Sequence, residues 1–199
     1  MDIDWIVRAV AEKIFVEVEA SGRHVHVTKE QALTIFGHDL TPVRELSQPG
    51  QYLAKERVTV VGPKGEFQNV AVLGPARKAA QVEISLTDGR ALGIDPPVRL
   101  SGRAEGSPGA VLVGSNGQVK LREGVICAQR HIHMTPEDGN RLGIRDGDMV
   151  KLKVYSKRPV IFEQVPVRIS GDFQTRVHLD FDEANACGFQ NGDLGRILQ

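Results

Sequence analysis

The spacing of apolar residues separates one helical segment at the start of the chain from the rest. Between residues 2 and 15, apolar side chains recur every three or four positions with charged residues between them; they are Ile3, Ile6, Val7, Val10 and Ile14. This is the spacing of an amphipathic helix. We therefore expect a helix over residues 2–15 that packs on the body of the protein, with docking to a partner as the alternative.

Beyond this segment the pattern changes to short valine-rich runs that end at glycine or proline. Residues 58–61 (VTVV) are followed by GPKG, and residues 110–113 (AVLV) are followed by GSNG. A β-branched run that ends in such a turn is typical of a strand in a hairpin. The sequence therefore predicts a mainly β fold.

Two pairs of segments repeat one another. Residues 23–30 (RHVHVTKE) match residues 130–137 (RHIHMTPE), sharing the arginine, both histidines, the threonine and the glutamate. Residues 81–93 also match residues 176–188, and in that alignment Glu83 falls on His178. Internal similarity of this kind indicates that the chain is built from related structural units.

All four segments read as a strand, a helix cap, a short helix and a glycine that ends it. The predicted caps are Thr28, Thr87, Thr135 and Asp182, and the predicted ends are Gly37, Gly93, Gly143 and Gly188. Side-chain oxygens accept from the first amides of a helix, and glycine tolerates the left-handed conformation at its end. We expect an N-terminal segment (1–20) and two related small β-barrels with short capping helices (21–124 and 125–199), and we leave open an exchange of strands between the halves.

Composition and charge narrow the class of protein. The 25 Lys and Arg residues balance 25 Asp and Glu residues, so the formal net charge is zero. A neutral chain lacks the basic surface that binds nucleic acid or anionic membranes, and we expect neither partner. Because no apolar run approaches the roughly 20 residues that span a bilayer, and no signal-peptide pattern is present, we expect an intracellular protein. Two cysteines, Cys127 and Cys187, are too few for a disulfide scaffold and read as buried thiols.

Four of the six histidines form two His-X-His motifs, at residues 24–26 and 131–133. Residues i and i+2 of a strand face the same side, so both imidazoles of a motif can bind one ion. The repeat proposes Glu83 and His178 as the third ligand of each site. Three protein ligands with one open position are typical of catalytic zinc. For each residue taken alone, the alternative is an ordinary surface or core side chain with no metal-binding role. The predicted metal sites are His24/His26/Glu83 and His131/His133/His178.

Arg77 is the predicted anion-binding residue. It follows a Gly-Pro turn and lies six positions before Glu83, which should bring its guanidinium near that metal site. A guanidinium is planar and permanently charged, so it binds phosphate or carboxylate through two contacts. A plain surface arginine is the alternative. Arg23 and Arg130 each precede a His-X-His motif and face the other side of the strand, so we expect structural ion pairs for them.

Six stretches resemble one known family. They are residues 22–26 (GRHVH), 46–51 (LSQPGQ), 72–77 (VLGPAR), 81–85 (QVEIS), 106–109 (GSPG) and 130–134 (RHIHM). In this order they resemble the propanediol-utilisation phosphotransacylases, the PduL-type phosphate acyltransferases, over nearly the whole chain. Residues 19–21 (EAS) and 127–129 (CAQ) depart from the family pattern but include no proposed ligand.

The resemblance implies two linked β-barrels and a dinuclear zinc site, with the two ions held by the two His pairs, Glu83 and His178. It implies that Arg77 is catalytic and contacts phosphate. The implied reaction converts a short-chain acyl-CoA, propanoyl-CoA or acetyl-CoA, and phosphate reversibly into acyl phosphate and CoA. It further implies a cytoplasmic location inside a bacterial microcompartment, with shell or lumen proteins as partners and residues 2–15 as an encapsulation segment. We also expect a homo-oligomer.

Two other functions fit the same ligands. Paired zinc ions also activate water, so a dinuclear zinc hydrolase acting on thioesters is one alternative. A metal-stabilised scaffold protein is the other, although such a protein is expected to close each zinc site with four protein ligands.

Overall fold

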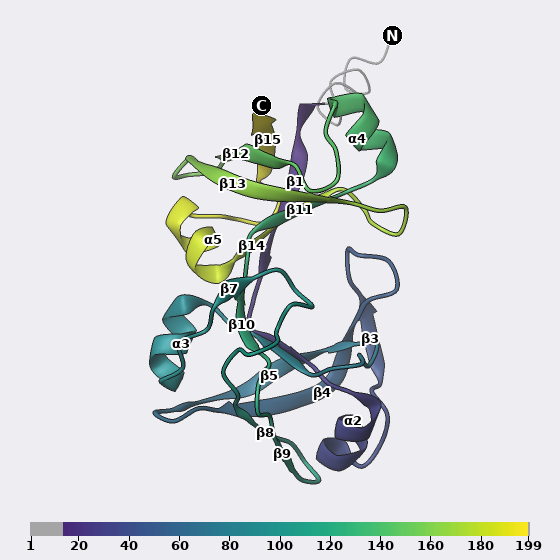
Figure 1. Ribbon diagram of the computed structural model, residues 1–199, viewed down its shortest axis with the longest axis vertical. Coiled ribbons are helices and arrows are strands. Elements are labelled where there is room, and N and C mark those ends of the chain that lie inside the picture. Colours follow the sequence, from purple (N-terminus) through teal and green to yellow (C-terminus); the bar gives the residue numbers. More distant parts are fainter. Residues whose placement is uncertain (1–13, 199) are drawn as a thin grey trace. The chain divides into compact units, whose positions relative to one another are not determined.

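The computed structural model describes residues 14–198 of the 199-residue chain (Figure 1). The described residues divide into two compact units: unit 1 holds residues 14–21, 130–179 and 183–198, and unit 2 holds residues 22–129 and 180–182. Residues 2–13 of the helix predicted over residues 2–15 lie outside the described part of the chain. The mainly β fold with short helices is confirmed.

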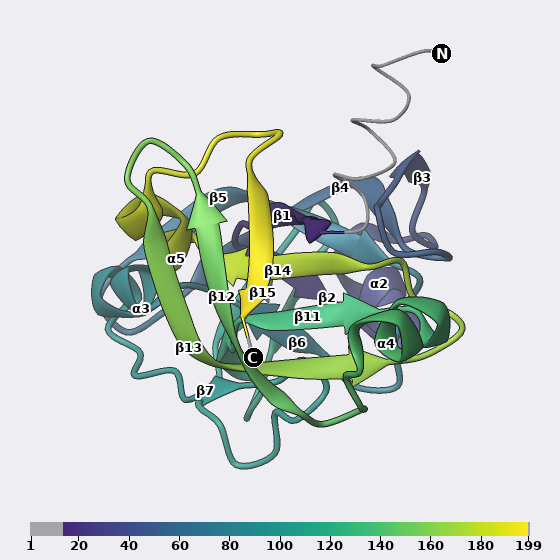
Figure 2. The ribbon, with the colours of Figure 1, turned by 90° about the horizontal axis from the view of Figure 1, so that it is seen from above.

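Unit 1 is built on a closed barrel with the strand order β1-β14-β11-β13-β12-β15, which Figure 2 shows from above. Its strands are β1 (Val16–Ser21), β11 (His131–Met134), β12 (Met149–Tyr155), β13 (Val160–Ile169), β14 (Arg176–Asp180) and β15 (Leu194–Leu198). Helix α4 (Pro136–Leu142) follows β11, and helix α5 (Phe181–Cys187) follows β14. Strand β1 closes the barrel against β15, where Val16 faces Gly195. Alternate residues point inward, so branched side chains such as Ile132 and Leu152 are fully buried.

Unit 2 is built on an open sheet, nine-stranded within the described residues, with the order β7-β10-β6-β2-β5-β4-β8-β9 and with β3 paired to β4. Its strands are β2 (His24–His26), β3 (Pro42–Glu45), β4 (Tyr52–Val61), β5 (Glu66–Gly74), β6 (Gln81–Glu83), β7 (Val98–Arg99), β8 (Val111–Val113), β9 (Gln118–Lys120) and β10 (Val125–Ala128). The helices are α2 (Lys29–Phe36) and α3 (Leu86–Leu92). The predicted hairpins are confirmed, because β4 pairs with β5 and β8 with β9. Strand β10 pairs with β6 and β7.

The sequence repeat is visible in the strand pairing. In unit 2, β2 lies between the antiparallel β6 and the parallel β5. In unit 1, β11 lies in the same way between the antiparallel β14 and the parallel β13. The middle residues of the two His-X-His motifs, Val25 and Ile132, face Val82 and Val177 across these antiparallel pairs. Equivalent residues of the two units therefore occupy equivalent sheet positions.

Two of the four predicted helix caps are confirmed. Thr28 and Thr135 cap α2 and α4, and each accepts from the amide three residues on. The prediction of Thr87 was wrong, since the cap lies two residues earlier, at Ser85, which forms a reciprocal capping box with Asp88. The prediction of Asp182 was also wrong, because that residue lies inside α5.

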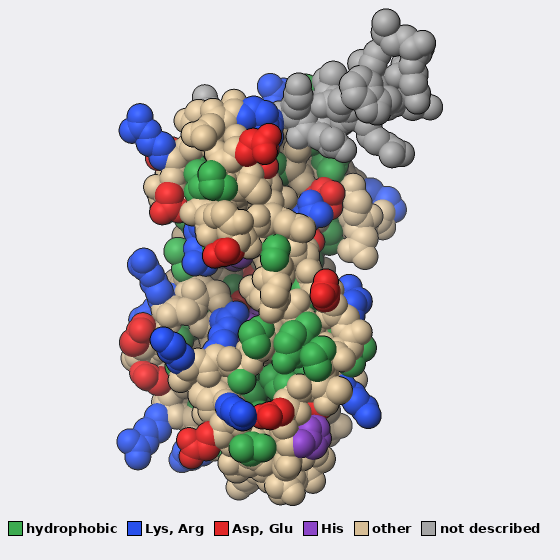
Figure 3. Space-filling model, turned by 90° about the vertical axis from the view of Figure 1, so that its right-hand side faces the viewer, with side chains coloured by type: hydrophobic (Ala, Val, Ile, Leu, Met, Phe, Trp, Pro, Cys, Tyr) green, Lys and Arg blue, Asp and Glu red, His purple; other side chains and the backbone are tan. Residues whose placement is uncertain are grey.

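The surface carries no concentration of charge of one sign on the face drawn in Figure 3, where basic and acidic side chains are interspersed. This agrees with the formal net charge of zero. Among residues 14–198, we find no helix whose length and apolar character would let it cross a membrane.

Candidate metal centres and anion-binding residues

The three predicted ligands of unit 2 converge at one point of the sheet. Strands β2 and β6 run antiparallel with His24 directly opposite Glu83, and the pleat places His26 on the same side as His24. The Nε2 atoms of His24 and His26 lie 3.5 and 3.9 Å from Glu83 Oε1. All three side chains are buried.

Backbone carbonyls orient both imidazoles of this triad. His24 Nδ1 lies 2.8 Å from the carbonyl oxygen of Gly22, and His26 Nδ1 lies 3.2 Å from that of Leu73. A carbonyl oxygen only accepts, so each Nδ1 carries the proton and donates it. The Nε2 lone pairs then point toward Glu83 and are available to a metal, which is the usual outer-shell arrangement of a histidine ligand.

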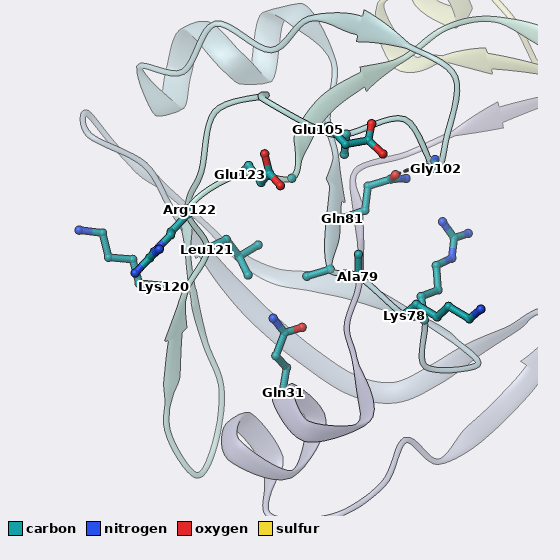
Figure 4. A pocket seen from close by; sticks show the side chains of 14 residues that line it. Gln31, Lys78, Ala79, Gln81, Gly102, Glu105, Lys120, Leu121, Arg122 and Glu123 are labelled. Atoms are coloured by element: carbon teal, nitrogen blue, oxygen red, sulfur yellow. Dashed lines mark hydrogen bonds between the residues drawn. The ribbon is translucent and has the colours of Figure 1, made fainter.

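Glu83 is held by two residues that the sequence reasoning missed. Gln81 Nε2 donates to Glu83 Oε1 at 2.6 Å, and Ser101 Oγ donates to the same oxygen at 2.8 Å. Gln81 Oε1 in turn accepts from the backbone amide of Gly102 at 2.8 Å, a bond drawn in Figure 4. Gln81 lies opposite His26 in the β2–β6 pair and two residues before Glu83. Because residues two apart in a strand face the same side, this spacing was the signal in the sequence that pointed to Gln81.

Burial and charge set the protonation of the unit 2 triad. Burial alone lowers the pKa of His24, but the carboxylate of Glu83 and the carbonyl of Gly22 outweigh it, so the pKa is raised. Burial, with the charges of His24 and Arg77, lowers the pKa of His26 to about 3. Burial by itself raises the pKa of Glu83, but the two imidazoles and Ser101 hold this pKa well below its usual range. A metal ion that displaces the proton of His24 would therefore find the Glu83 carboxylate ionised and the His26 imidazole neutral.

Arg77 is coupled to this triad through one hydroxyl group. Its NH1 donates to Ser101 Oγ at 3.1 Å, and that hydroxyl donates on to Glu83. The backbone amide of Arg77 donates to the carbonyl of Val27 at 2.9 Å, which ties the Gly-Pro turn to the end of β2. The structure thus places the predicted anion-binding residue beside a predicted metal ligand, as the spacing in the sequence indicates.

Arg77 and Gln81 also line a cavity of about 450 Å³ in unit 2 (Figure 4). The other charged residues of its lining are Lys78, Glu105, Lys120, Arg122 and Glu123. Glu123 Oε2 accepts from the backbone amide of Gly106 at 2.6 Å. With four cationic and two anionic side chains, this lining favours an anion over a cation near Arg77.

The three predicted ligands of unit 1 converge in the same way. Strands β11 and β14 place His131 opposite His178, and His133 shares the face of His131. The ring centroids lie 4.6 Å apart for His131 and His133, 5.0 Å for His131 and His178, and 4.9 Å for His133 and His178. One ligand atom from each residue lies within 4.8 Å of the other two, as in the unit 2 triad.

His133 is a buried imidazole whose ring nitrogens have no hydrogen-bond partner among residues 14–198. Burial, with the charges of His131 and Arg168, lowers the pKa of this imidazole to about 3. A buried polar group without a partner is rare in proteins, because its desolvation is not compensated. An ion bound between the three imidazoles would supply the missing partner.

The donor sets of both triads fit zinc. Zinc prefers imidazole nitrogen and carboxylate oxygen in tetrahedral geometry at about 2.0–2.2 Å, which puts ligand atoms about 3.4 Å apart. The Nε2–Oε1 separations of 3.5 and 3.9 Å in unit 2 are close to this value. A zinc ion held by the three side chains of a triad would keep one tetrahedral position open for a substrate atom.

The two arginines that precede the His-X-His motifs make structural ion pairs, as predicted. Arg23 donates to both carboxylate oxygens of Asp88, at 3.0 and 2.7 Å, and its guanidinium lies 4.0 Å from the ring centroid of Phe67. Arg130 pairs with Glu183. The partners in these ion pairs, Asp88 and Glu183, are not members of either triad.

Two sets of three candidate metal ligands, one of them joined through Ser101 to an arginine, suit an enzyme that handles anionic substrates. The family model for phosphate propanoyltransferase matches residues 17–190. A phosphate propanoyltransferase of Leptotrichia buccalis is 55% identical over 90% of this chain and 86% of its own. One of Listeria monocytogenes is 51% identical over 99% and 93%, and one of Thermotoga maritima is 53% identical over 92% and 88%. The chain belongs to the phosphate propanoyltransferase family, a family of phosphotransacylases.

Proposed function

We propose that this protein is a phosphate acyltransferase that uses two zinc ions, one in each unit. It converts propanoyl-CoA or acetyl-CoA and phosphate into acyl phosphate and CoA, and it catalyses the reverse reaction. The observation that carries this proposal is the hydrogen-bonded path from Arg77 through Ser101 to Glu83, which couples an anion-binding group to a metal ligand. Membership of the phosphate propanoyltransferase family supports the substrates.

Arg77 binds the phosphate in this reaction. Its guanidinium can hold two phosphate oxygens at once, which orients one of the other two for attack. The bond to Ser101 restrains the side chain before phosphate arrives, so less conformational entropy is lost on binding. The low pKa of Glu83 keeps this ligand ionised at neutral pH.

The transfer needs no covalent intermediate on the protein. A phosphate oxygen forms a bond to the thioester carbonyl carbon, the carbon–sulfur bond breaks, and the CoA sulfur takes up the proton that the phosphate loses. Zinc at the triads would supply Lewis acidity and would favour the thiolate form of CoA. Cys127 is not required as a nucleophile, and its Sγ is buried and lies 3.3 Å from Asp180 Oδ2.

The experiment that tests this function measures thiol release from propanoyl-CoA and acetyl-CoA with and without phosphate, before and after zinc removal. We expect thiol release that depends on phosphate and zinc, with acyl phosphate seen by phosphorus NMR. Free acid as the product, at a rate independent of phosphate, would identify a thioester hydrolase instead. Because a methylene group is worth about 1–3 kcal/mol in a fitted pocket, the ratio of kcat/KM for the two substrates measures the acyl preference.

We further propose that the protein works as a homo-oligomer inside a bacterial microcompartment, among shell or lumen proteins, with residues 2–15 as its encapsulation segment. The amphipathic pattern of residues 2–15 supports a docking helix. A fluorescent protein fused to residues 1–20 should form foci in compartment-forming cells. Diffuse fluorescence would contradict the encapsulation role.

A further inference from the structure

The two units hold the second histidine of each motif in different ways. In unit 2, His26 Nδ1 donates to the carbonyl of Leu73 at 3.2 Å. In unit 1, the equivalent His133 makes no hydrogen bond through either ring nitrogen within the described residues. Hydrogen bonding therefore orients the ring of His26 but not that of His133.

An aromatic side chain lies against the His133 ring instead. The ring centroids of Phe173 and His133 are 4.1 Å apart and the ring planes differ by 23°, which is a stacked arrangement. The guanidinium carbon of Arg168 lies 5.6 Å from the centroid of the Phe173 ring. Stacking restricts the tilt of both rings, so Phe173 limits the planes that His133 can adopt.

The loop that carries Phe173 is tied to the residues that follow His133. The Ser170 amide donates to the carbonyl of Met134 at 3.2 Å, and the Thr135 amide donates to Thr175 Oγ1 at 3.1 Å. Within the loop, the Phe173 amide donates to the carbonyl of Ser170 at 3.2 Å. These bonds hold the loop on both sides of Phe173, so the stacking partner is in place before a ligand arrives.

The repeat places a different residue at the corresponding position of unit 2. Val72 of β5 and Val167 of β13 pair with the middle residues of the two motifs, and Lys78 and Phe173 each follow six positions later. The loop of unit 2 carries Arg77, and the carbonyl of Leu73 in β5 supports His26, whereas the loop of unit 1 carries an aromatic ring that stacks on His133.

We propose that Phe173 is a positioning residue for the metal site of unit 1. Its ring holds His133 in the plane in which a ring nitrogen faces the same point as His131 and His178, and so replaces the hydrogen bond that His26 has in unit 2. This role rests on the zinc sites of the proposed function. It assigns Phe173 no contact with the reacting atoms.

The test compares Phe173→Leu, which keeps an apolar side chain but removes the ring, with Phe173→Tyr, which keeps the ring. Zinc affinity of each site is measured by competition with a chromophoric chelator, and a His24→Ala background isolates the unit 1 site. We expect Phe173→Leu to weaken zinc binding in unit 1 by about 10–100-fold, the usual effect of losing an outer-shell partner, and Phe173→Tyr to restore it. In the same Phe173 variants with His24 retained, the affinity of the unit 2 site should be unchanged.

Two further measurements separate positioning from a loss of packing. Phe162→Leu is a matched control, because Phe162 is a buried phenylalanine of the same barrel with an arginine guanidinium also 5.6 Å from its ring centroid. It should leave the zinc affinity unchanged. In protein loaded with cobalt(II), the visible absorption of the unit 1 site should shift in Phe173→Leu and not in Phe162→Leu.

The outcomes distinguish this inference from the proposed function. Wild-type protein that binds two zinc ions and keeps both affinities in Phe173→Leu would overturn the role of Phe173 alone. Equal weakening by Phe173→Leu, Phe173→Tyr and Phe162→Leu would also overturn it, since stacking would not be the cause. Wild-type protein with no zinc in unit 1 would overturn both the zinc site and the role of Phe173.

Discussion

Ser101 Oγ lies 2.8 Å from Glu83 Oε1 and donates its only proton to that carboxylate. Ser101 Oγ also accepts from Arg77 NH1 at 3.1 Å and from Gln81 Nε2 at 2.8 Å. A hydroxyl has one donor and two acceptor positions, so all three are used. Ser101 thereby joins a group suited to phosphate to a group suited to zinc.

Replacing Ser101 with alanine should impair phosphate use more than metal binding. Arg77 loses the acceptor that joins it to the triad, while Glu83 keeps the hydrogen bond from Gln81. Because hydrogen bonds to charged groups contribute about 1.5–3 kcal/mol, kcat/KM for phosphate should fall by about 10–100-fold. The measurement is steady-state kinetics at varied phosphate, together with zinc content. Ser107→Ala is the control, since Ser107 is also buried and hydrogen-bonded in unit 2 but makes its bonds to backbone groups.

Replacing Arg77 with alanine should abolish efficient phosphate use and leave the zinc content at the wild-type value. The guanidinium is not a metal ligand, and Ser101 links it by hydrogen bonds to Glu83. Arg77→Lys keeps the charge but cannot make the two-point contact, so it should recover only part of the activity. Turnover by Arg77→Ala that matches wild type at low phosphate would contradict the role of Arg77.

Stepwise chelation should remove the zinc of unit 1 before that of unit 2. The unit 2 ligands include a carboxylate, and carbonyls orient both of its imidazoles. The unit 1 ligands are three imidazoles, and His133 has no hydrogen-bond partner within the described residues. Loss of such a partner usually lowers affinity by about 10–100-fold. Zinc content during titration with a chelator should show two steps, and the His178→Ala variant should lack the weaker one.

The metal-free protein should become less stable as the pH falls from about 6.5 toward 4. The pKa of His26 and that of His133 are each lowered to about 3, so below the ordinary value of 6.5 the unfolded state binds more protons than the folded state. The stability from these two imidazoles is full above pH 6.5 and is lost as the pH falls toward 3. The opposite shift at His24 offsets part of this effect. The measurement is urea unfolding at several pH values, and a free energy of unfolding that rises on acidification would contradict the prediction.

The convergence of the candidate metal ligands in two triads could be predicted from the sequence because the chain repeats itself. Period-2 geometry brings the histidines of each motif to one face, and the repeat aligns Glu83 with His178. The strand register then makes His24 face Glu83 and His131 face His178. The alternation of side chains along a strand and the internal repeat were sufficient to predict these six residues, because all six lie in short regular strands.

Residues that reach the triads from irregular segments could not be predicted. Ser101 lies in a turn after β7, and Phe173 lies in the loop before β14. Their contacts with Glu83 and His133 depend on how loops fold over the sheet, which no periodic pattern encodes. The helix caps at Thr87 and Asp182 failed for a related reason. Only Ile84 separates β6 from Ser85, the cap of α3, so the cap predicted at Thr87 was placed two residues too late.

The most direct test of the account counts zinc ions in the intact chain and in two variants. Native mass spectrometry should find two zinc ions per chain in the wild type. It should find one in Glu83→Ala, which lacks a unit 2 ligand, and one in His178→Ala, which lacks a unit 1 ligand. Fewer than two zinc ions in zinc-saturated wild type, or two in either variant, would contradict the assignment of one metal to each triad.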